Sequence, residues 1–335
     1  MMSSMCERLG IGIPIIQAPM GGAVGPALAA AVSNAGGLGT LALGGADIDT
    51  LRGQVRETQA LTSKPFAVNL NLEFPQEERL EACLREKVPV ISFFWREPSA
   101  LVERAKQAGA VVLHTVSTAK DARQAVECGV DVVVAQGWEA GGHVRGTVAT
   151  MPLIPAVVDA VGSVPVVAAG GIADGRGLAA ALALGASGAW IGTRFLASHE
   201  VAIHPHYRER LLRATENDTI YVDELFDIGW PSAPHRVLRN STFAQWESAG
   251  RPATGSRPGE GEIVATSKSR GPIVRYRSYT PGADADGDIE ALSLWAGQSV
   301  ALVHKVQPAA EIVREIVSEA QSVLDRIARH RLEIC

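Results

Sequence analysis

Short apolar runs rich in β-branched residues recur about every 20–25 residues up to position 191. This spacing is typical of βα units, in which a helix follows each strand and leads into the next parallel strand. The run Val130–Ala135 contains three consecutive valines, as expected of a strand buried on both faces. The predicted strands are Ile13–Gln17, Gly39–Leu43, Phe66–Leu70, Val90–Phe93, Val111–Thr115, Val130–Ala135, Val164–Ala168 and Gly188–Ile191.

Segments rich in Ala, Leu, Glu and Arg lie between these runs and predict helices, as in Gly25–Ala35, Gln76–Glu86 and Ser99–Ala108. Thr118 and Asp174 are suitable N-caps for two further helices. Eight strands alternating with helices favour a closed parallel barrel over an open doubly wound sheet, and no GxGxxG motif follows the first strand. The predicted fold class is therefore α/β, a (β/α)8 barrel over residues 1–215.

The pattern changes in residues 216–288, which are rich in Gly, Pro, Ser and Arg and predict an inserted, lid-like subdomain. Within it, the nearly non-apolar stretch 249–261 predicts an exposed loop. Residues 289–335 are expected to return to the barrel as two helices, Ile289–Val303 and Ala309–His330. In the second helix Ile312, Ile316, Val323 and Ile327 are spaced to pack on the outside of the barrel.

Composition narrows the classes of partner. The 335 residues carry a net charge of −5 without a basic block, which argues against nucleic acid and anionic membranes. Residues 1–9 lack the apolar core of a signal peptide, and the Ala-rich stretch 177–191 is too short to span a bilayer. The four scattered cysteines, including Cys335, predict reduced thiols in a cytoplasmic protein.

The C-terminal ends of the strands are where such barrels place their active sites. Gly170-Gly171 and Gly192-Thr193 follow the last two predicted strands and form a predicted phosphate cradle, because glycine turns expose backbone N–H groups. A short helix after the eighth strand would direct its positive end at the same dianion. Each pair alone is more often a tight turn, whereas the two at adjacent strand ends favour phosphate.

Other strand ends carry groups suited to a heterocycle. Asn69 and Gln136 present amides that could bind a pyrimidine edge or simply tie loops together. Pro19-Met20 could support a ring, although core filling is the default for a single methionine. His143 follows the turn Gly141-Gly142 and is the predicted catalytic base, since its ordinary pKa lies near neutrality.

The remaining histidines and the missing motifs exclude other chemistry. His114 is expected to be half buried and structural, and His204 and His206 are expected on the surface or as helix caps. No HExxH spacing is present, so no metal is predicted. No GxSxG occurs and no cysteine lies at a predicted strand end, which argues against acyl transfer by a nucleophile.

Five segments together resemble the nitronate monooxygenase family of FMN-dependent TIM barrels, formerly called 2-nitropropane dioxygenases. The similarity runs in order from about residue 13 to 205 and resumes at 294–298 and 308–312. The five segments are Ile16-Gln-Ala-Pro-Met-Gly-Gly22, Phe66-Ala-Val-Asn69, Glu139-Ala-Gly-Gly-His143, Ala168-Ala-Gly-Gly-Ile-Ala-Asp174 and Gly192-Thr-Arg-Phe-Leu196.

The resemblance implies a role for each matching position. It places Ala18, Pro19 and Met20 along the flavin ring, and Asn69, Gln136, Gly141 and Gly142 around its polar edge. It assigns the FMN phosphate to Gly170, Gly171, Gly192 and Thr193, and makes His143 the active-site base.

The activity implied is oxidation of alkyl nitronates, and possibly nitroalkanes, by O2 to a carbonyl compound and nitrite. His143 would remove the acidic α-proton of a nitroalkane or, when protonated, bind a nitronate. The expected partners are a small substrate and O2, and a homodimer is a possible assembly. One alternative is a flavin-dependent enoyl-(acyl-carrier-protein) reductase, which shares the Glu-Ala-Gly-Gly-His motif, and another is a related NADH:quinone reductase. A third is a non-redox barrel that binds a phosphorylated metabolite.

Overall fold

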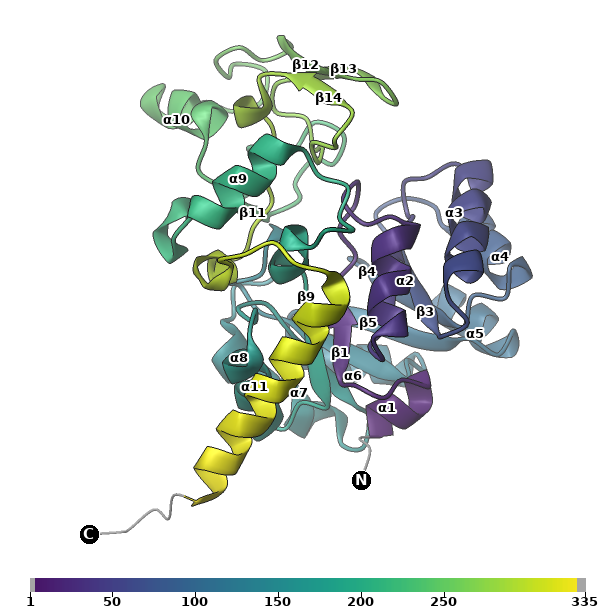
Figure 1. Ribbon diagram of the computed structural model, residues 1–335. Helices are drawn as coiled ribbons and strands as arrows, with labels where there is room; N and C mark the ends of the chain where they lie inside the picture. The colour runs from purple at the N-terminus through teal and green to yellow at the C-terminus, as the bar shows by residue number, and fades with distance from the viewer. Residues whose placement is uncertain (1–3, 330–335) are drawn as a thin grey trace.

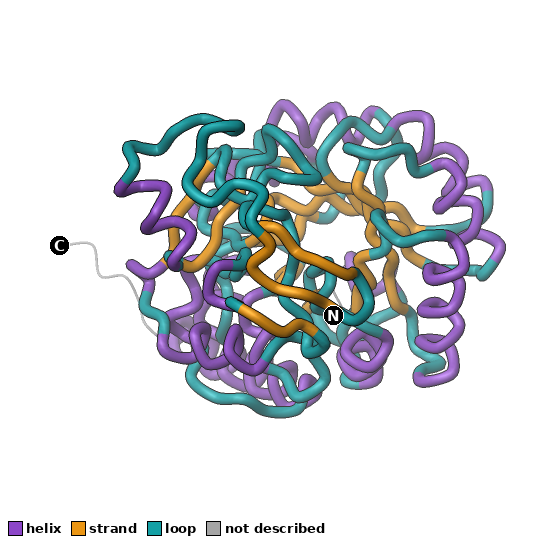
Figure 2. Tube along the Cα trace, turned by 90° about the horizontal axis from the view of Figure 1, so that it is seen from above, coloured by secondary structure: helices purple, strands orange, loops and turns teal. Residues whose placement is uncertain are grey.

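The computed structural model describes residues 4–329; positions 1–3, His330 and Cys335, on which parts of the predictions above fall, lie outside this range. Eight parallel strands follow one another around a barrel in the order β1-β9-β8-β6-β5-β4-β3-β2. The ring of strands, with helices outside it, is visible from above in Figure 2. The strands are β1 (Ile15–Gln17), β2 (Gly39–Ala42), β3 (Phe66–Asn71), β4 (Val90–Phe94), β5 (Val111–Val116), β6 (Val132–Gln136), β8 (Val166–Ala169) and β9 (Gly188–Ile191).

The seam between β1 and β2 closes the barrel. A parallel bridge joins Ile16 to Leu38. The fully buried amide side chain of Gln17 continues this pairing, accepting from the backbone N–H of Thr40 at 3.0 Å and donating to its carbonyl at 3.3 Å. The predicted (β/α)8 TIM barrel is therefore confirmed, and Gln17 at its first strand end is used for closure.

Alternate residues of β6 pack on opposite sides of the barrel wall. Val132 and Val134 belong to the cluster that includes Ile16 and Leu113, whereas Val133 packs in the larger outer cluster. The three valines are thus buried on both faces, as their sequence predicted. The helices of the barrel layer are α1 (Ser4–Leu9), α2 (Pro26–Asn34), α3 (Ile48–Leu61), α4 (Glu77–Arg85), α5 (Ser99–Gln107), α6 (Ala119–Glu127), α7 (Thr150–Val161) and α8 (Gly175–Ala183).

Side-chain caps begin several helices. Thr118 accepts from the N–H of Asp121 at the start of α6, and Asp174 accepts from Gly177 in α8. His204 caps α9 (Pro205–Arg213) by accepting from the N–H of His206. All three caps were predicted from sequence.

Residues 216–288 lie above the C-terminal ends of the barrel strands (Figure 1). A three-stranded sheet in the order β10-β11-β7 joins this lid segment to the barrel. Its strand β7 (Gly142–His143) belongs to the loop after β6. The other elements are η2 (Glu216–Asp218), β10 (Thr219–Val222), β11 (His235–Leu238), α10 (Ser241–Ser248), β12 (Ile263–Ser267), β13 (Gly271–Val274) and β14 (Ala285–Gly287).

The segment predicted as a helix over 289–303 is not one. It forms two short 3₁₀ turns, η3 (Ile289–Ala291) and η4 (Gln298–Leu302), with an irregular stretch between them. Trp295 in that stretch bridges Val237 of β11, so cross-strand contact displaces helical hydrogen bonding. The exposed loop 249–261 is largely as predicted, except that the Arg257 side chain is fully buried and bonded to Asp227 and Glu260.

Helix α11 (Ala309–Arg329) packs outside the barrel against α8 and α2, as Figure 1 shows. Ile312 and Ile316 are buried, whereas Ile327 is 55% exposed and does not pack as predicted. A Cβ on Gly175 would lie 2.3 Å from the backbone N of Ala320, so α8 needs glycine where α11 crosses it. In residues 4–329 no helix is both long and apolar enough to cross a membrane.

Candidate functional site

The loop after β6 is fixed to the barrel by its own polar groups. The Gln136 side chain donates to the carbonyl of His143 at 3.2 Å. The Glu139 carboxylate accepts from the backbone N–H and hydroxyl of Thr150, which begins α7, and that hydroxyl lies 3.1 Å from the Gly170 carbonyl. The loop that carries His143 is therefore tied directly to the Gly170 turn.

Gly141 and Gly142 are needed for different reasons. Gly142 has φ +71°, which disfavours any residue with a side chain. A Cβ on Gly141 would lie only 2.4 Å from the backbone N of Gly297, so this position requires glycine because the C-terminal segment packs against it. The N–H of Gly297 also donates to the Thr193 hydroxyl, linking this loop to the turn after β9.

The lid segment surrounds His143 with aromatic rings. β7 pairs antiparallel with β11, which places His143 opposite His235. The Trp230 indole stacks on the His143 imidazole, with ring centroids 3.8 Å apart and 26° between the planes. Trp295 and Trp95 lie with their centroids 5.1 and 6.2 Å from that imidazole.

Burial in this environment sets the protonation of His143. Desolvation, reinforced by His235 nearby, lowers the pKa of His143 well below its usual range. Its Nε2 atom is buried and makes no hydrogen bond within residues 4–329. A neutral imidazole with an unused nitrogen can accept a proton from a bound molecule at neutral pH.

His235 is also held neutral. Burial lowers its pKa to about 4. Its Nε2 accepts from the N–H of Phe226, so Nδ1 carries the proton and donates to the carbonyl of Ala233. Both ring nitrogens of His235 thus make hydrogen bonds, and these hold its strand, β11, beside His143.

Trp95 stands at the end of β4 in a strained conformation. Its φ of +92° is unusual for a bulky residue. Arg145 donates to the Trp95 carbonyl at 2.8 Å and holds this geometry. Strain of this kind is most often found at functional sites.

The predicted phosphate cradle consists of two adjacent turns. Gly170 and Gly171 have φ +96° and +73°, and Gly171 is exposed. Gly192 precedes the 3₁₀ helix η1 (Thr193–Ala197), the short helix expected after the eighth strand. In the described part of the chain, the backbone N–H groups of these four residues take no part in the hydrogen bonds of turns and loops.

The residues predicted along a ring lie beside the cradle. A Cβ on Gly192 would lie 3.5 Å from that of Ala18 and 3.7 Å from Sδ of Met20. Pro19, between them, is partly exposed. Asn69, two residues before the end of β3, donates to the hydroxyl of Ser92 through its amide nitrogen, and its amide oxygen can accept from a ligand. The side-chain amide of Gln136 instead donates within its own loop, to the carbonyl of His143.

A family model for nitronate monooxygenase matches residues 2–82 and 72–319 of this chain. The chain belongs to the nitronate monooxygenase family. Nitronate monooxygenase of Paraburkholderia phytofirmans is 33% identical over 97% of this chain and 96% of its own. The recognition made from motifs is thus confirmed, and the chain is a flavin-dependent oxidoreductase.

Two further similarities come from proteins with other names. A (3aS,4S,5R,7aS)-5-hydroxy-7a-methyl-1-oxo-octahydro-1H-indene-4-carboxyl-CoA dehydrogenase of Mycobacterium tuberculosis is 40% identical over 74% of this chain and 69% of its own. The structure of FabK from Thermotoga maritima superposes with a TM-score of 0.81, at 34% identity, covering 98% of this chain and 99% of that one.

The site of this nitronate monooxygenase family member fits a flavin phosphate. Within residues 4–329, four backbone N–H groups at these two turns make no turn or loop hydrogen bond, and such groups are the donors that a phosphate dianion requires. A side chain at Gly170 would contact the backbone of the His143 loop at 3.0 Å, so the turn stays bare.

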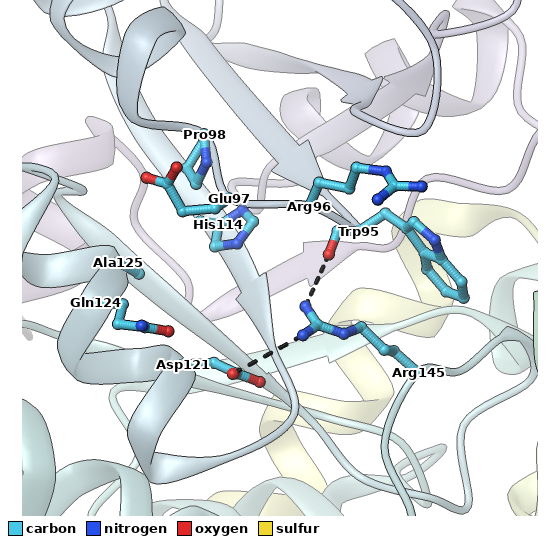
Figure 3. A pocket seen from close by; sticks show the side chains of 9 residues that line it. All are labelled: Trp95, Arg96, Glu97, Pro98, His114, Asp121, Gln124, Ala125 and Arg145. Carbon is cyan, nitrogen blue, oxygen red and sulfur yellow. Dashed lines mark hydrogen bonds and ion pairs between the residues drawn. The ribbon is translucent and has the colours of Figure 1, made fainter.

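A pocket of about 440 Å³ is lined by Trp95, His114 and Arg145 among other residues (Figure 3). His114 lines it and is 4% exposed, more deeply buried than the half-buried residue predicted, because it faces the helices outside β5. Burial lowers its pKa to about 4. Arg145 joins Trp95 to Asp121 across this pocket, as the dashed lines in Figure 3 show.

Sequence reasoning missed the aromatic residues around His143, namely Trp95, Trp230 and Trp295, and it missed His235. Trp230 lies in a region that showed no regular pattern, and its partner is 87 positions away in the chain. The only local signal was the pair Gly229-Trp230 before a proline, which indicates a turn rather than a site.

Proposed function

We propose that this protein binds FMN and oxidises alkyl nitronates with O2, giving a carbonyl compound and nitrite. The observation that carries the proposal is the neutral His143, whose uncommitted Nε2 lies among aromatic rings on a loop that Thr150 ties to the Gly170 turn. The family model and the similarity to a nitronate monooxygenase support the same reaction class.

FMN would rest on the residues already described. Gly170, Gly171, Gly192 and Thr193 would hold its phosphate through backbone N–H groups. Ala18, Pro19 and Met20 would line the ring, while Asn69, Gln136, Gly141 and Gly142 would lie at its polar edge. When bound, FMN supplies the redox chemistry that connects the substrate carbon to O2.

His143 would accept the α-proton of a neutral substrate or donate a hydrogen bond to an anionic one. A nitro group acidifies the neighbouring C–H, so the neutral imidazole could accept that proton from a nitroalkane. A nitronate has already lost it, and its negative charge would instead raise the pKa of His143 and favour the protonated, hydrogen-bonding form. Exclusion of water by the surrounding rings strengthens either interaction.

A second candidate is NAD(P)H-dependent reduction, in the manner of an enoyl-(acyl-carrier-protein) or quinone reductase. The superposition on FabK over nearly the whole chain favours it. The relative that acts on a carboxyl-CoA compound makes an acyl thioester a reasonable substrate for such a reaction.

Anaerobic reduction separates the two candidates. We expect ethyl nitronate to bleach the visible absorbance of the FMN-loaded protein without any nicotinamide cofactor. NADH and NADPH, mixed separately under the same conditions, should leave that absorbance unchanged over the same time. Bleaching by NADH or NADPH alone would replace the proposal with the reductase reading.

A further inference from the structure

His143 is half-buried as a residue, but its Nε2 atom is fully buried, so something must move before a substrate reaches that nitrogen. Trp230 covers one face of its imidazole at 3.8 Å, and Trp295, tilted by 40°, lies 5.1 Å away. Trp95 and His235 approach at steep angles. Because Nε2 is buried among these rings, a nitronate cannot contact it in this arrangement.

Two of the four enclosing side chains, those of Trp295 and His235, are anchored by hydrogen bonds, and Trp95 is held through its backbone. Trp295 donates from Nε1 to the Thr280 hydroxyl at 3.0 Å, and its carbonyl accepts from the Tyr207 hydroxyl. Arg145 holds the backbone of Trp95. His235 is bonded through both of its ring nitrogens.

Trp230 is held differently. Its Nε1 is buried and makes no hydrogen bond in the described part of the chain, so its indole is retained by ring contacts alone. Besides the stack on His143, those contacts are T-shaped pairs with Phe74, Phe94 and Trp95. Its backbone lies in an exposed turn flanked by two residues with positive φ, Gly229 at +97° and Ser232 at +53°.

We propose that Trp230 is the residue that admits substrate to His143 and determines which substrates enter. Rotation of an indole out of a stacked position opens a space that is flat and about one ring thick. A nitronate is planar at its reacting carbon and nitrogen, so a short-chain nitronate fits that space. A substrate with a bulky or tetrahedral group next to the reacting carbon does not.

This substrate class rests on the proposed function, but the gating part does not. Diethyl pyrocarbonate modifies accessible neutral imidazoles and needs no turnover. We therefore treat the purified protein with this reagent and follow His143 by peptide mass spectrometry. Exposed His199, in the same digest, serves as the internal reference.

We expect His143 in the unmodified protein to react at least tenfold more slowly than His199, and Trp230→Ala to raise its rate at least tenfold. Ile263→Ala is the matched control, since Ile263 is a lid-segment residue that is 60% exposed and belongs to β12, away from the ring contacts of Trp230. Equal rates for His143 and His199 in the unmodified protein, or no acceleration in Trp230→Ala, would overturn the gate.

Specificity is measured separately, as kcat/KM for ethyl nitronate and cyclohexyl nitronate. Trp230→Ala should raise the cyclohexyl-to-ethyl ratio at least tenfold, and Ile263→Ala should leave it unchanged. An unchanged ratio in Trp230→Ala would refute the specificity assignment. If the unmodified protein turns over neither nitronate, the proposed function fails and the specificity assignment fails with it, while the modification rates still decide the gate.

Discussion

The barrel and the lid segment contribute to the site in different ways. The barrel contributes mainly backbone N–H groups, at the turns of Gly170, Gly171 and Gly192. The lid segment offers side chains, of which Trp230 and His235 set the environment of His143. Substitutions in the barrel turns should therefore change the affinity for the cofactor. Substitutions in the lid segment should change the pKa of His143 and the access of substrate to it.

His143→Ala tests this separation most strongly, because the residue stands where the two regions meet. General-base catalysis contributes roughly 10²–10⁴-fold, so turnover of neutral nitroalkanes should fall by about that factor. FMN should stay bound, since its predicted ligands are in the barrel. Steady-state rates and flavin content measure the two effects, with His199→Ala as the control. Loss of FMN together with activity would show that the regions are not separable in this way.

Two glycine substitutions test how the barrel turns contribute to stability and to FMN binding. In Gly170→Ala the new Cβ would meet backbone atoms at 3.0 Å at a φ of +96°, which costs on the order of 1–3 kcal/mol, so both Tm and FMN affinity should fall.

In Gly192→Ala the backbone is relaxed, at φ −108°, and the methyl group makes ordinary contacts with Ala18 and Met20. Tm should be unchanged while FMN affinity falls by about tenfold, the effect of one methyl group in a close-fitting site. Calorimetry and fluorescence titration of the apoprotein with FMN would measure these values. Unchanged affinity in Gly192→Ala would place the flavin elsewhere.

The smallest expected effect is on the pH dependence of the free energy of unfolding. It is tested with one buried histidine from each region. His114 in the barrel and His235 in the lid segment both have pKa values of about 4 in the folded protein, below the ordinary value of 6.5. Because the unfolded chain binds more protons in this window, stability is full above about pH 6.5 and is lost as the pH falls towards 4. Between pH 7 and 5 each should account for about 2 kcal/mol.

Urea unfolding at the two pH values checks this expectation. His114→Gln and His235→Gln should each reduce the pH dependence by a similar amount, without abolishing it, since the lowered pKa of His143 acts in the same direction. If the lid segment unfolds independently, only His235→Gln would alter an early transition. A pH dependence unaffected by both variants would contradict the burial argument.

Local sequence predicted most of the barrel because its determinants are local. Each β-branched run was found as a strand, and Thr118 and Asp174 cap helices as expected. Segment 289–303 was predicted wrongly because its apolar residues serve contacts across the barrel mouth. There Trp295 bridges β11 and Gly297 packs on Gly141, and those contacts replace a helix.

The sequence alone determined the α/β barrel, the family, and the presence of glycine turns and an imidazole at its strand ends. Strand periodicity and turn residues act over a few positions, so they can be read directly. Only the tertiary structure decided what surrounds that imidazole. The pairing of β7 with β11 joins segments about ninety residues apart and brings Trp230 and His235 to His143. No local pattern specifies that register, because it is fixed by burial of the assembled aromatic cluster.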